Sequence, residues 1–371
     1  MTAVMHPSSV RLVCTRCAKL HPLDAPLWRC PCGGPLLAEV LSPPPTLEAG
    51  AGRVGLWRYR GSLPILSSEA IVSLGEGMTP LVPAQMAGHD FMLKCDYCNP
   101  TGSWKDRGWS VAVSRLKELG IDAVVEDSSG NSGASLAAYG ARAGIRVTVF
   151  VPHDCPPTKQ KQIRAHGARV IAIPGGRDAV TAACMEAART TFYAGHAWNP
   201  WFLTGPRTLA WEITEQIGKA PAAVFMPLGQ GGLLLGLFHG FSALAESGQI
   251  PALPRLVPVQ AAACAPVVAG WSEGRATPPP VTPGRTMADA IRTPHPVRYP
   301  DVIEAIRKSR GDAVAVQEDE IRQALHMLGR AGFFVEPTSA AAAAGALKWL
   351  PRVPVDGPVV IILTGHGLKA A

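Results

Sequence analysis

The sequence has few charged and few aromatic residues, and it lacks long apolar runs. Charged residues make up 17% of the 371 residues and aromatic residues 6%, whereas 47% are hydrophobic. This composition is typical of a well-packed globular protein and argues against extended disorder. No apolar run reaches the roughly 18 residues that a membrane helix requires. Because the N-terminal stretch MTAVMHPSSVRLVC also has no hydrophobic signal region, we expect a cytoplasmic protein with no membrane partner.

Long runs of like charge are missing as well, although the net charge is +7. Scattered Lys and Arg side chains favour an anionic small molecule as the ligand and disfavour nucleic acid. The chain is too long for one ordinary domain, since domains usually contain about 100 to 200 residues. Two α/β domains and a short appendage are therefore expected.

The N-terminal appendage is rich in cysteine. Four of the nine cysteines, Cys14, Cys17, Cys30 and Cys32, form the pattern C-x2-C followed by C-x-C-G-G. Paired thiolates on two turns are typical of a small zinc ribbon, in which four sulfur atoms surround one ion. The C-x-C half is tighter than the usual knuckle, so a reduced, metal-free remnant of such a ribbon is the alternative.

Beyond the proline-rich link at 42–46, predicted strands and helices alternate along the chain. This alternation is typical of parallel sheets, and it predicts two doubly wound α/β domains. The segment 271–300, rich in Pro and Thr, is expected to be a long irregular loop. The predicted strands are 122–129, 146–152, 168–174, 222–227, 255–260 and 358–365, and the predicted helices are 132–143, 158–166, 208–217 and 318–330.

Three loops that follow predicted strands carry unusual residues, and ligands of open α/β sheets bind at such loops. In SSGNSGAS, which starts at Ser128, backbone amides and the Asn131 carboxamide can face a carboxylate, although a plain helix cap explains the same pattern. In PLGQGGLLLG, which starts at Pro227, glycines open an apolar helix that can cradle a phosphate; a tight turn without a ligand is the alternative. In LTGHGLK, Thr364 offers a neutral hydroxyl to a heteroaromatic nitrogen, and His366 is expected to serve a backbone hydrogen bond.

The stretch NPTGSWKDRG places Lys105 directly after a turn. Alone, it would indicate a solvated helix start. A lysine, a phosphate cradle, a polar partner for a ring nitrogen and an amide-lined carboxylate site are together what pyridoxal phosphate requires. Lysine forms an imine with an aldehyde when burial and neighbouring cations lower its pKa.

These motifs resemble, in order and over nearly the full length, those of the threonine synthase family of pyridoxal-phosphate enzymes, whose fold is that of the tryptophan synthase β-subunit. The resemblance implies that Lys105 forms the imine and that Ser128, Ser129, Asn131, Ser132 and Gly133 surround the substrate carboxylate. Other motifs that carry it are LGEGMTPLV at Leu74–Val82, K-x-x-Q-x-x-x-x-G-A at Lys159–Ala168 and VEPTSAAA at Val335–Ala342. The implied cofactor contacts are Asn131 to the ring hydroxyl, Gly229, Gln230, Gly231, Gly232 and Leu233 to the phosphate, and Thr364 to the ring nitrogen.

Two positions depart from the family pattern. Trp104 stands where the family usually has Phe, and it adds bulk beside the cofactor. Phe202, in WNPWFLTGPRT, stands where the family has an arginine associated with the substrate's phosphate, while Arg207 keeps the charge of a family lysine. A bidentate grip on an anion would be lost at Phe202. We count Phe202 and Arg207 among the expected substrate-binding residues.

The resemblance implies a lyase that eliminates from, or replaces a group on, a β- or γ-substituted L-amino acid, which is expected to be anionic. The alternatives within this chemistry are threonine synthase acting on O-phosphohomoserine, β-replacement of the cysteate synthase type and a Ser or Thr ammonia-lyase. A silent homologue that binds a partner through its ribbon is an alternative from another class, which Lys105 disfavours. The assembly, with a homodimer among the options, is left open.

The expected domain bounds follow from the order of motifs. Residues 1–45 form the ribbon-like segment, residues 46–110 and 186–371 the large cofactor-binding domain, and residues 111–185 the small α/β domain. The resemblance places the cofactor between the two α/β domains.

Overall fold

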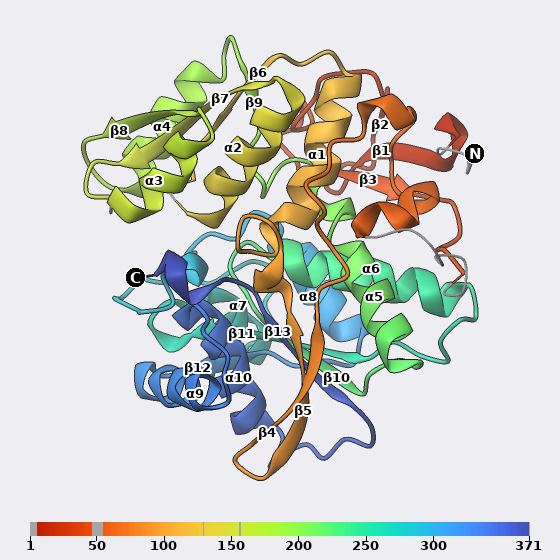
Figure 1. Ribbon diagram of the computed structural model, residues 1–371, viewed down its shortest axis with the longest axis vertical. Helices are drawn as coiled ribbons and strands as arrows, with labels where there is room; N and C mark the ends of the chain where they lie inside the picture. Colours follow the sequence, from red (N-terminus) through yellow and green to blue (C-terminus); the bar gives the residue numbers. More distant parts are fainter. Residues whose placement is uncertain (1–5, 47–54, 129, 156, 371) are drawn as a thin grey trace. The chain divides into compact units, whose positions relative to one another are not determined.

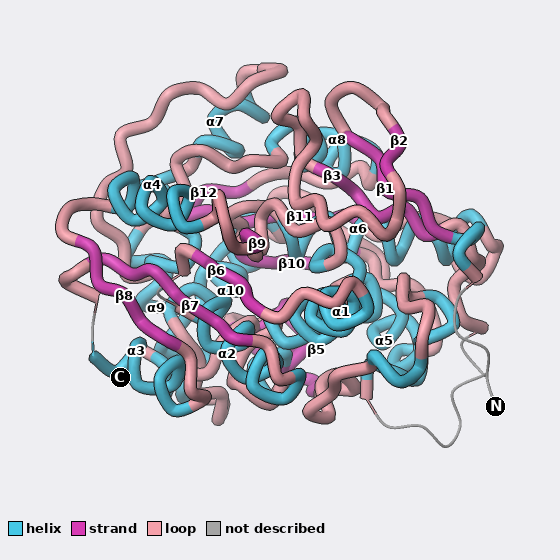
Figure 2. The backbone as a smooth tube through the Cα atoms, turned by 90° about the horizontal axis from the view of Figure 1, so that it is seen from above, coloured by secondary structure: helices cyan, strands magenta, loops and turns pink. Residues whose placement is uncertain are grey.

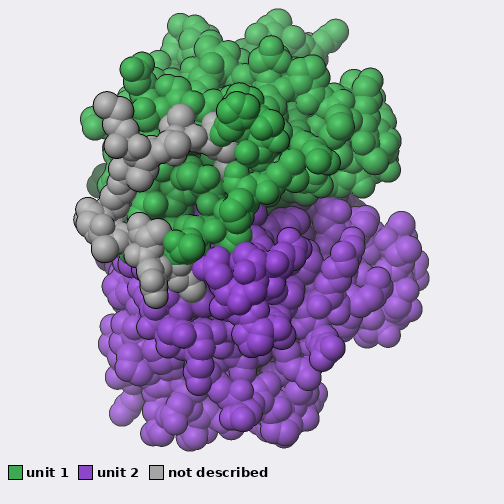
Figure 3. All heavy atoms as spheres, turned by 90° about the vertical axis from the view of Figure 1, so that its right-hand side faces the viewer, with its two compact units in different colours: residues 1–77, 99–206 green, residues 78–98, 207–371 purple. Residues whose placement is uncertain are grey.

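The computed structural model describes residues 6–46, 55–128, 130–155 and 157–370. The chain forms two compact units, which Figure 3 colours separately. Unit 1 comprises Met1–Gly77 and Asn99–Pro206, and unit 2 comprises Met78–Cys98 and Arg207–Ala371. The expected domain bounds stay a prediction, because a compact unit is defined by its contacts and a domain also by its ability to fold alone.

Unit 1 contains a small antiparallel sheet and a parallel sheet. The antiparallel sheet has the order β2-β1-β3 and carries Cys14 at the end of β1. The parallel sheet has the order β8-β7-β6-β9, and Figure 2 shows β8, β7 and β6 side by side. The strands are β1 (Val10–Cys14), β2 (Leu20–His21), β3 (Leu36–Val40), β6 (Ala123–Glu126), β7 (Arg146–Pro152), β8 (Arg169–Ile173) and β9 (Phe192–Tyr193).

In unit 1, helices alternate along the chain with the strands of the parallel sheet. Helix α2 packs on α1 and β7, and it ends at Gly144, whose φ of 73° is typical of a helix C-terminus. Where α2 crosses β7, a Cβ on Gly140 would lie 2.4 Å from a methyl of Val147, so glycine permits this close packing. The helices are α1 (Lys105–Glu118), α2 (Asn131–Ala143), α3 (Pro157–Ala165) and α4 (Arg177–Ala187).

Unit 2 is built on one six-stranded sheet with the order β12-β11-β10-β13-β5-β4. Its strands are parallel except for the edge strand β4, which pairs antiparallel with β5 (Figure 1). Every residue of β10 and β13 is buried, as expected for central strands of a parallel sheet covered on both faces. The strands are β4 (Leu81–Met86), β5 (His89–Cys95), β10 (Ala223–Pro227), β11 (Arg255–Ala261), β12 (Val314–Val316) and β13 (Val359–Leu363).

The helices of unit 2 include the alanine-rich α10, which packs against β10 and β11. A Cβ on Gly345 of α10 would lie 2.3 Å from Val259, so the small residue allows the helix to approach the sheet. The helices are α5 (Arg207–Ile217), α6 (Gly232–Glu246), α7 (Pro266–Ser272), α8 (Tyr299–Lys308), α9 (Glu318–Arg330) and α10 (Pro337–Trp349). Within the ranges that the structure describes, no helix combines the length and the apolar character needed to cross a membrane.

The α/β fold predicted from the sequence is confirmed, and each predicted strand and helix is found within a few residues of its expected bounds. The segment 271–300 is mainly irregular and contains the short 3-10 helix Asp289–Ile291. The β4–β5 hairpin was missed. Pro83 within β4 disfavours a strand, but an edge strand tolerates proline because one side of it has no hydrogen-bonding neighbour.

Candidate active site

Lys105 is the first residue of α1, and the turn before it is firmly held. Gly102 has a φ of 84°, which favours glycine, and its N–H donates to the carbonyl oxygen of Asn99 at 2.8 Å. The buried Asp106 carboxylate accepts hydrogen bonds from the backbone N–H and the hydroxyl of Thr101 at 2.6 and 2.5 Å. A further hydrogen bond comes from Ser135 of α2 at 2.5 Å. The Thr-Gly and Asp residues of the motif therefore fix the position from which the lysine projects.

The amine of Lys105 lies among aromatic rings. Its Nζ is 4.4 Å from the centroid of the Trp104 ring and 5.5 Å from that of Phe202. The side chain is only partly buried as a whole, yet these surroundings desolvate the amine. Desolvation lowers the pKa of Lys105 to about 7, although the negative charge of Glu126 opposes the change. A lysine with such a pKa supplies a neutral, nucleophilic amine near neutral pH.

Phe202 is fully buried, and it packs as a core residue. Its ring makes edge contacts with Trp104 and Trp109 at centroid distances of 5.8 and 5.2 Å. The His196 ring lies at 5.7 Å. The position that the family resemblance assigns to a substrate-binding arginine is thus filled by an apolar ring beside the amine of Lys105.

The loop after β6 leads into α2, as the sequence predicts, and Asn131 is the first residue of that helix. The N-terminal N–H groups of a helix have no partners within it, so they can bind a carboxylate. The hydroxyl of Ser132 is engaged inside the unit, since it accepts from Trp109 Nε1 at 2.9 Å and donates to Glu126 at 2.6 Å. The N–H of Gly133 donates to the Ser128 hydroxyl at 3.4 Å. Ser129 lies outside the described residues.

The glycine loop of unit 2 runs from the end of β10 to the start of α6. Gly231 has a φ of 93°, and a Cβ there would lie 2.4 Å from a methyl of Val302. Gly232 is the first residue of α6, so the free N–H groups and positive dipole of the helix face the loop. The Gln230 side chain accepts a hydrogen bond from Val297 N–H at 3.0 Å, and Leu233 is buried, which leaves its backbone as the part available to a ligand. Gly229, also in the loop, has Ala290 O 3.2 Å from its missing Cβ.

Thr364 follows β13 and is buried. Its hydroxyl lies 3.2 Å from the hydroxyl of Ser339, which also accepts the N–H of Thr364 at 2.9 Å. This neutral hydroxyl pair suits a neutral contact with a ring nitrogen. His366 accepts a hydrogen bond from Leu368 N–H at 3.1 Å, so the structural role predicted for it is confirmed.

Arg207 contributes buried positive charge to unit 2. It is 7% exposed, and its Nε has no hydrogen-bond partner among the described residues. Burial lowers the pKa of Arg207 to about 10, and the charge of Glu246 opposes this change. The charges of Arg207 and Arg298 help burial to lower the pKa of His239 to about 3, so the histidine is neutral. An anionic group of a substrate would therefore find the cationic side chains of Arg207 and Arg298 in this part of unit 2.

Glu126 and His196, two residues near Lys105, were not predicted from the sequence. Glu126 ends β6 and is fully buried, and its Oε1 lies 3.3 Å from Nδ1 of His196. Desolvation of the acid raises the pKa of Glu126 to about 8. The sequence signal that could have found Glu126 is an acid at the end of an apolar strand, because a fully buried acid is seldom without a polar partner.

The chain was compared with known proteins. The family model described as "Pyridoxal-phosphate dependent enzyme" matches residues 72–365. The chain belongs to this family. It is 36% identical to a threonine synthase from Methanocaldococcus jannaschii over 96% of this chain and 92% of the relative. It is also 38% identical to a threonine synthase from Synechocystis sp. over 84% of this chain and 82% of the relative. We therefore describe it as a threonine synthase-like, pyridoxal-phosphate dependent lyase.

Solved structures show the same fold. A threonine deaminase from T.th. superposes with a TM-score of 0.65 at 25% identity, covering 78% of this chain and 92% of that chain. Maize serine racemase superposes with a TM-score of 0.68 at 22% identity, covering 78% and 88%. The residues of this chain fit the cofactor of the family, since the loop at Gly231 has no room for a side chain and Lys105 offers a weakly basic amine.

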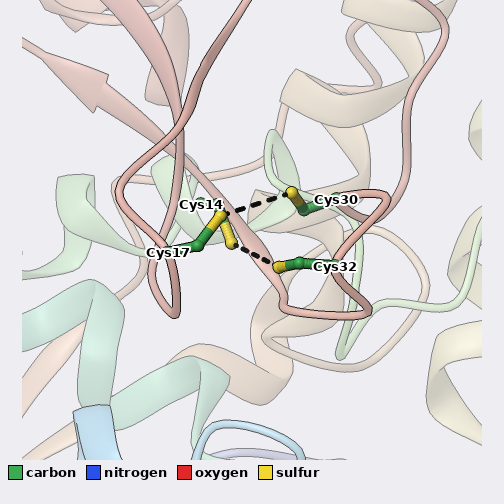
Figure 4. Close-up of side chains that lie close together, drawn as sticks. All are labelled: Cys14, Cys17, Cys30 and Cys32. Carbon is green, nitrogen blue, oxygen red and sulfur yellow. Dashed lines mark hydrogen bonds between the residues drawn. The ribbon is translucent and has the colours of Figure 1, made fainter.

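The four N-terminal cysteines lie together in unit 1 (Figure 4). The sulfur atoms of Cys14 and Cys32 are 3.5 Å apart and those of Cys17 and Cys30 are 3.7 Å apart. All four sulfur atoms lie within 4.8 Å of one another. Thiolates around a tetrahedral zinc are separated by a similar distance, given Zn–S bonds of about 2.3 Å. The cluster has the donor type and spacing of a metal site.

Proposed function

We propose that the chain binds pyridoxal phosphate through Lys105 and acts on an L-amino acid with a leaving group at Cβ or Cγ. The cofactor supplies an electron sink that acidifies the Cα proton of the bound amino acid. The single observation that carries the proposal is the desolvated amine of Lys105, whose pKa is lowered to about 7. Such an amine can accept the Cα proton near neutral pH.

The remaining predicted residues would bind and orient the cofactor and the substrate. The N-terminal N–H groups of α2, from Asn131 to Gly133, would hold the substrate carboxylate, and the Asn131 side chain would contact the cofactor's ring hydroxyl. The N-terminus of α6, preceded by the glycine loop, would hold the phosphate. Thr364 would give the ring nitrogen a neutral partner, which leaves the ring less electron-withdrawing than a carboxylate partner would and suits elimination and replacement better than transamination.

The purified protein should be yellow, and borohydride should fix the cofactor to the peptide that contains Lys105. Lys105→Ala should abolish this covalent link and retain weaker, reversible cofactor binding. Titration with a panel of substituted L-amino acids, followed by absorbance, should identify the substrate. A wild-type protein that stays colourless after incubation with the cofactor would overturn the proposal.

Threonine synthesis from O-phosphohomoserine is the second candidate. Arg207 favours it, because a buried arginine with an unpaired Nε offers a charged contact to a phosphate. Phe202 disfavours it, because the apolar ring removes a second charged contact from the position that the resemblance assigns to arginine. A β-replacement of the cysteate synthase type and a Ser or Thr ammonia-lyase reaction would rely on the same proposed residues of this chain. The product formed distinguishes these reactions from threonine synthesis.

We also propose that Cys14, Cys17, Cys30 and Cys32 hold one zinc ion. The clustering of their sulfur atoms within 4.8 Å supports this proposal. Metal analysis of the purified protein should return about one zinc per chain. The double variant Cys14→Ser, Cys17→Ser should lose the metal and melt at a lower temperature. A metal-free wild type that melts at the same temperature with and without added zinc would identify the cluster as a remnant.

A further inference from the structure

The amine of Lys105 lies over the faces of two aromatic rings. Its Nζ is 4.4 Å from the centroid of the Trp104 ring and 5.5 Å from that of Phe202. A cation within about 6 Å of a ring centroid is attracted by the negative charge of the ring face, and indole attracts it most strongly. Within the described ranges, the side chain of Lys105 makes no hydrogen bond or ion pair. The ring faces are therefore the contacts that can stabilise a positive charge on this amine.

The two rings are held in place by the structure of unit 1. Their centroids are 5.8 Å apart and their planes meet at 71°, so the rings form an aromatic corner. Phe202 is fully buried and also packs against Trp109, at a centroid distance of 5.2 Å. The carbonyl oxygen of Trp104 accepts the N–H of Arg107 at 3.2 Å, in the first turn of α1. The aromatic corner is thus fixed by the same helix that presents the amine.

The proposed reaction creates a positive charge at this position. When Lys105 accepts the Cα proton of the bound amino acid, the C–H bond breaks and an N–H bond forms at Nζ. The electron pair stays with the substrate carbon, from which the cofactor withdraws it. Desolvation penalises the ammonium that results. A carboxylate in contact with the amine would keep it protonated, whereas a ring face attracts the ammonium more weakly and lets the proton leave again.

We propose that Trp104 is a catalytic residue whose indole face holds the ammonium form of Lys105, with the Phe202 ring as the second face of the aromatic corner. This inference rests on the proposed role of Lys105 as the proton acceptor. Trp104 thereby makes the desolvated amine a stronger base than it would be beside an aliphatic side chain. The residue that the family usually has at position 104, phenylalanine, offers a weaker ring face than tryptophan.

The ionisable groups around the amine are the same whichever residue stands at position 104. The charge of Glu126 favours the ammonium form of Lys105, but burial raises the pKa of that acid to about 8. Burial and the positive charges of Lys105 and Arg177 hold the pKa of His196 well below its usual range, so His196 is neutral. The Asp106 carboxylate is engaged by hydrogen bonds within unit 1. Changes made to the ring of residue 104 alone therefore report on the ring.

The proposal can be tested on the full-length protein freed of cofactor. The lysines are labelled with carbon-13 at Cε, and the signal that Lys105→Arg removes is followed by NMR as the pH changes. In the wild type this signal should titrate near pH 7. Fluorinated tryptophan withdraws electrons from the ring face and hardly changes its shape, so its incorporation should lower the midpoint by roughly a few tenths of a pH unit. In Trp104→Phe, the same labelling should leave the Lys105 midpoint unchanged.

Substitutions at position 104 give a second measurement. Trp104→Phe should lower the Lys105 midpoint, and Trp104→Leu should lower it further, by about one pH unit from the wild type. Trp28→Phe is the matched control, because the Trp28 ring packs against Tyr193, at a centroid distance of 4.8 Å. It should leave the midpoint at its wild-type value. Thermal melting should establish that each variant is folded, and the fluorinated wild type decides the question if Trp104→Leu is not.

A ring that acted only by excluding water would give the opposite sign. Trp104→Leu would then admit water, and the Lys105 midpoint would rise toward the value of about 10.4 of an ordinary lysine. Such a rise would overturn the proposal, and so would a midpoint that fluorination of the wild type leaves unchanged. Neither result affects the yellow colour of the wild type or the borohydride fixation of the cofactor. Failure of this inference is therefore distinguishable from failure of the proposed function.

Discussion

Gly108 and Phe202 lie so close together that a Cβ on residue 108 would be 2.4 Å from the Phe202 ring. Gly108 is in the first turn of α1, the helix that begins at Lys105, so the missing side chain is the space into which the ring packs. This contact fixes Phe202 against the helix that presents the amine.

Gly108→Ala should therefore destabilise the fold, although alanine favours helices more than glycine does. Overpacking a tight core costs about 1 to 3 kcal/mol, against a gain in helix propensity of up to about 1 kcal/mol. Urea unfolding should show a lower midpoint. Gly329→Ala, in α9, is the matched control, since a Cβ there meets no atom within 4 Å. It should be neutral or stabilising, and equal effects of the two changes would contradict the packing argument.

O-phosphohomoserine should be a poor substrate. Loss of one charge-assisted contact to a desolvated anion costs about 2 to 5 kcal/mol, or roughly 30-fold to several thousand-fold in kcat/KM. Threonine formation should be measured in the wild type and in Phe202→Arg, which should gain activity toward this substrate even though a buried arginine lowers its stability. Phe202→Leu controls for the loss of the ring. Efficient wild-type turnover without a gain from arginine would make the chain an ordinary threonine synthase.

Covalent uptake of the cofactor should depend on pH. Only the neutral amine of Lys105 attacks an aldehyde, and its pKa is lowered to about 7. The rate of uptake by the cofactor-free protein should thus rise as the pH increases toward 7 and level off above it. Stopped-flow absorbance measures this rate, with Lys105→Arg as the variant that lacks the covalent phase. A rate that keeps rising up to about pH 10, the range in which an unperturbed lysine titrates, would indicate an ordinary amine.

Gly231→Ala should weaken cofactor binding. Alanine at a φ of 93° is strained by about 1 to 3 kcal/mol, and its methyl group would also displace Val302. The loop should shift, and the dissociation constant for pyridoxal phosphate should rise about tenfold or more, since about 1.4 kcal/mol corresponds to a factor of ten. Gly248→Ala, just beyond the other end of α6, imposes similar strain at a φ of 73° with no atom near its Cβ. This control should reduce stability and leave cofactor affinity unchanged.

Much of the fold was predictable because buried parallel strands appear in the sequence as apolar runs, such as VVIIL in β13. In the helices between them, apolar residues recur with the helical period. The loop residues of the candidate site were predictable from glycine and helix-start chemistry. The contact between Glu126 and His196 was not, since the two residues are 70 positions apart in the sequence and only the tertiary fold brings them together. Ser132 illustrates the same limit, because its hydroxyl binds Trp109 and Glu126 while its sequence motif suggested a ligand.

The hydrogen bond from Val297 N–H to the Gln230 side chain joins the glycine loop to the end of the irregular segment 271–300. Whatever orders the glycine loop will also restrain that segment, whose proline-rich exposed stretch offers a protease ready access. Resistance to limited proteolysis within 273–298 should therefore rise with the fraction of chains that carry the cofactor. A simple gel would then report the occupancy of the phosphate cradle in a preparation whose colour is too weak to measure.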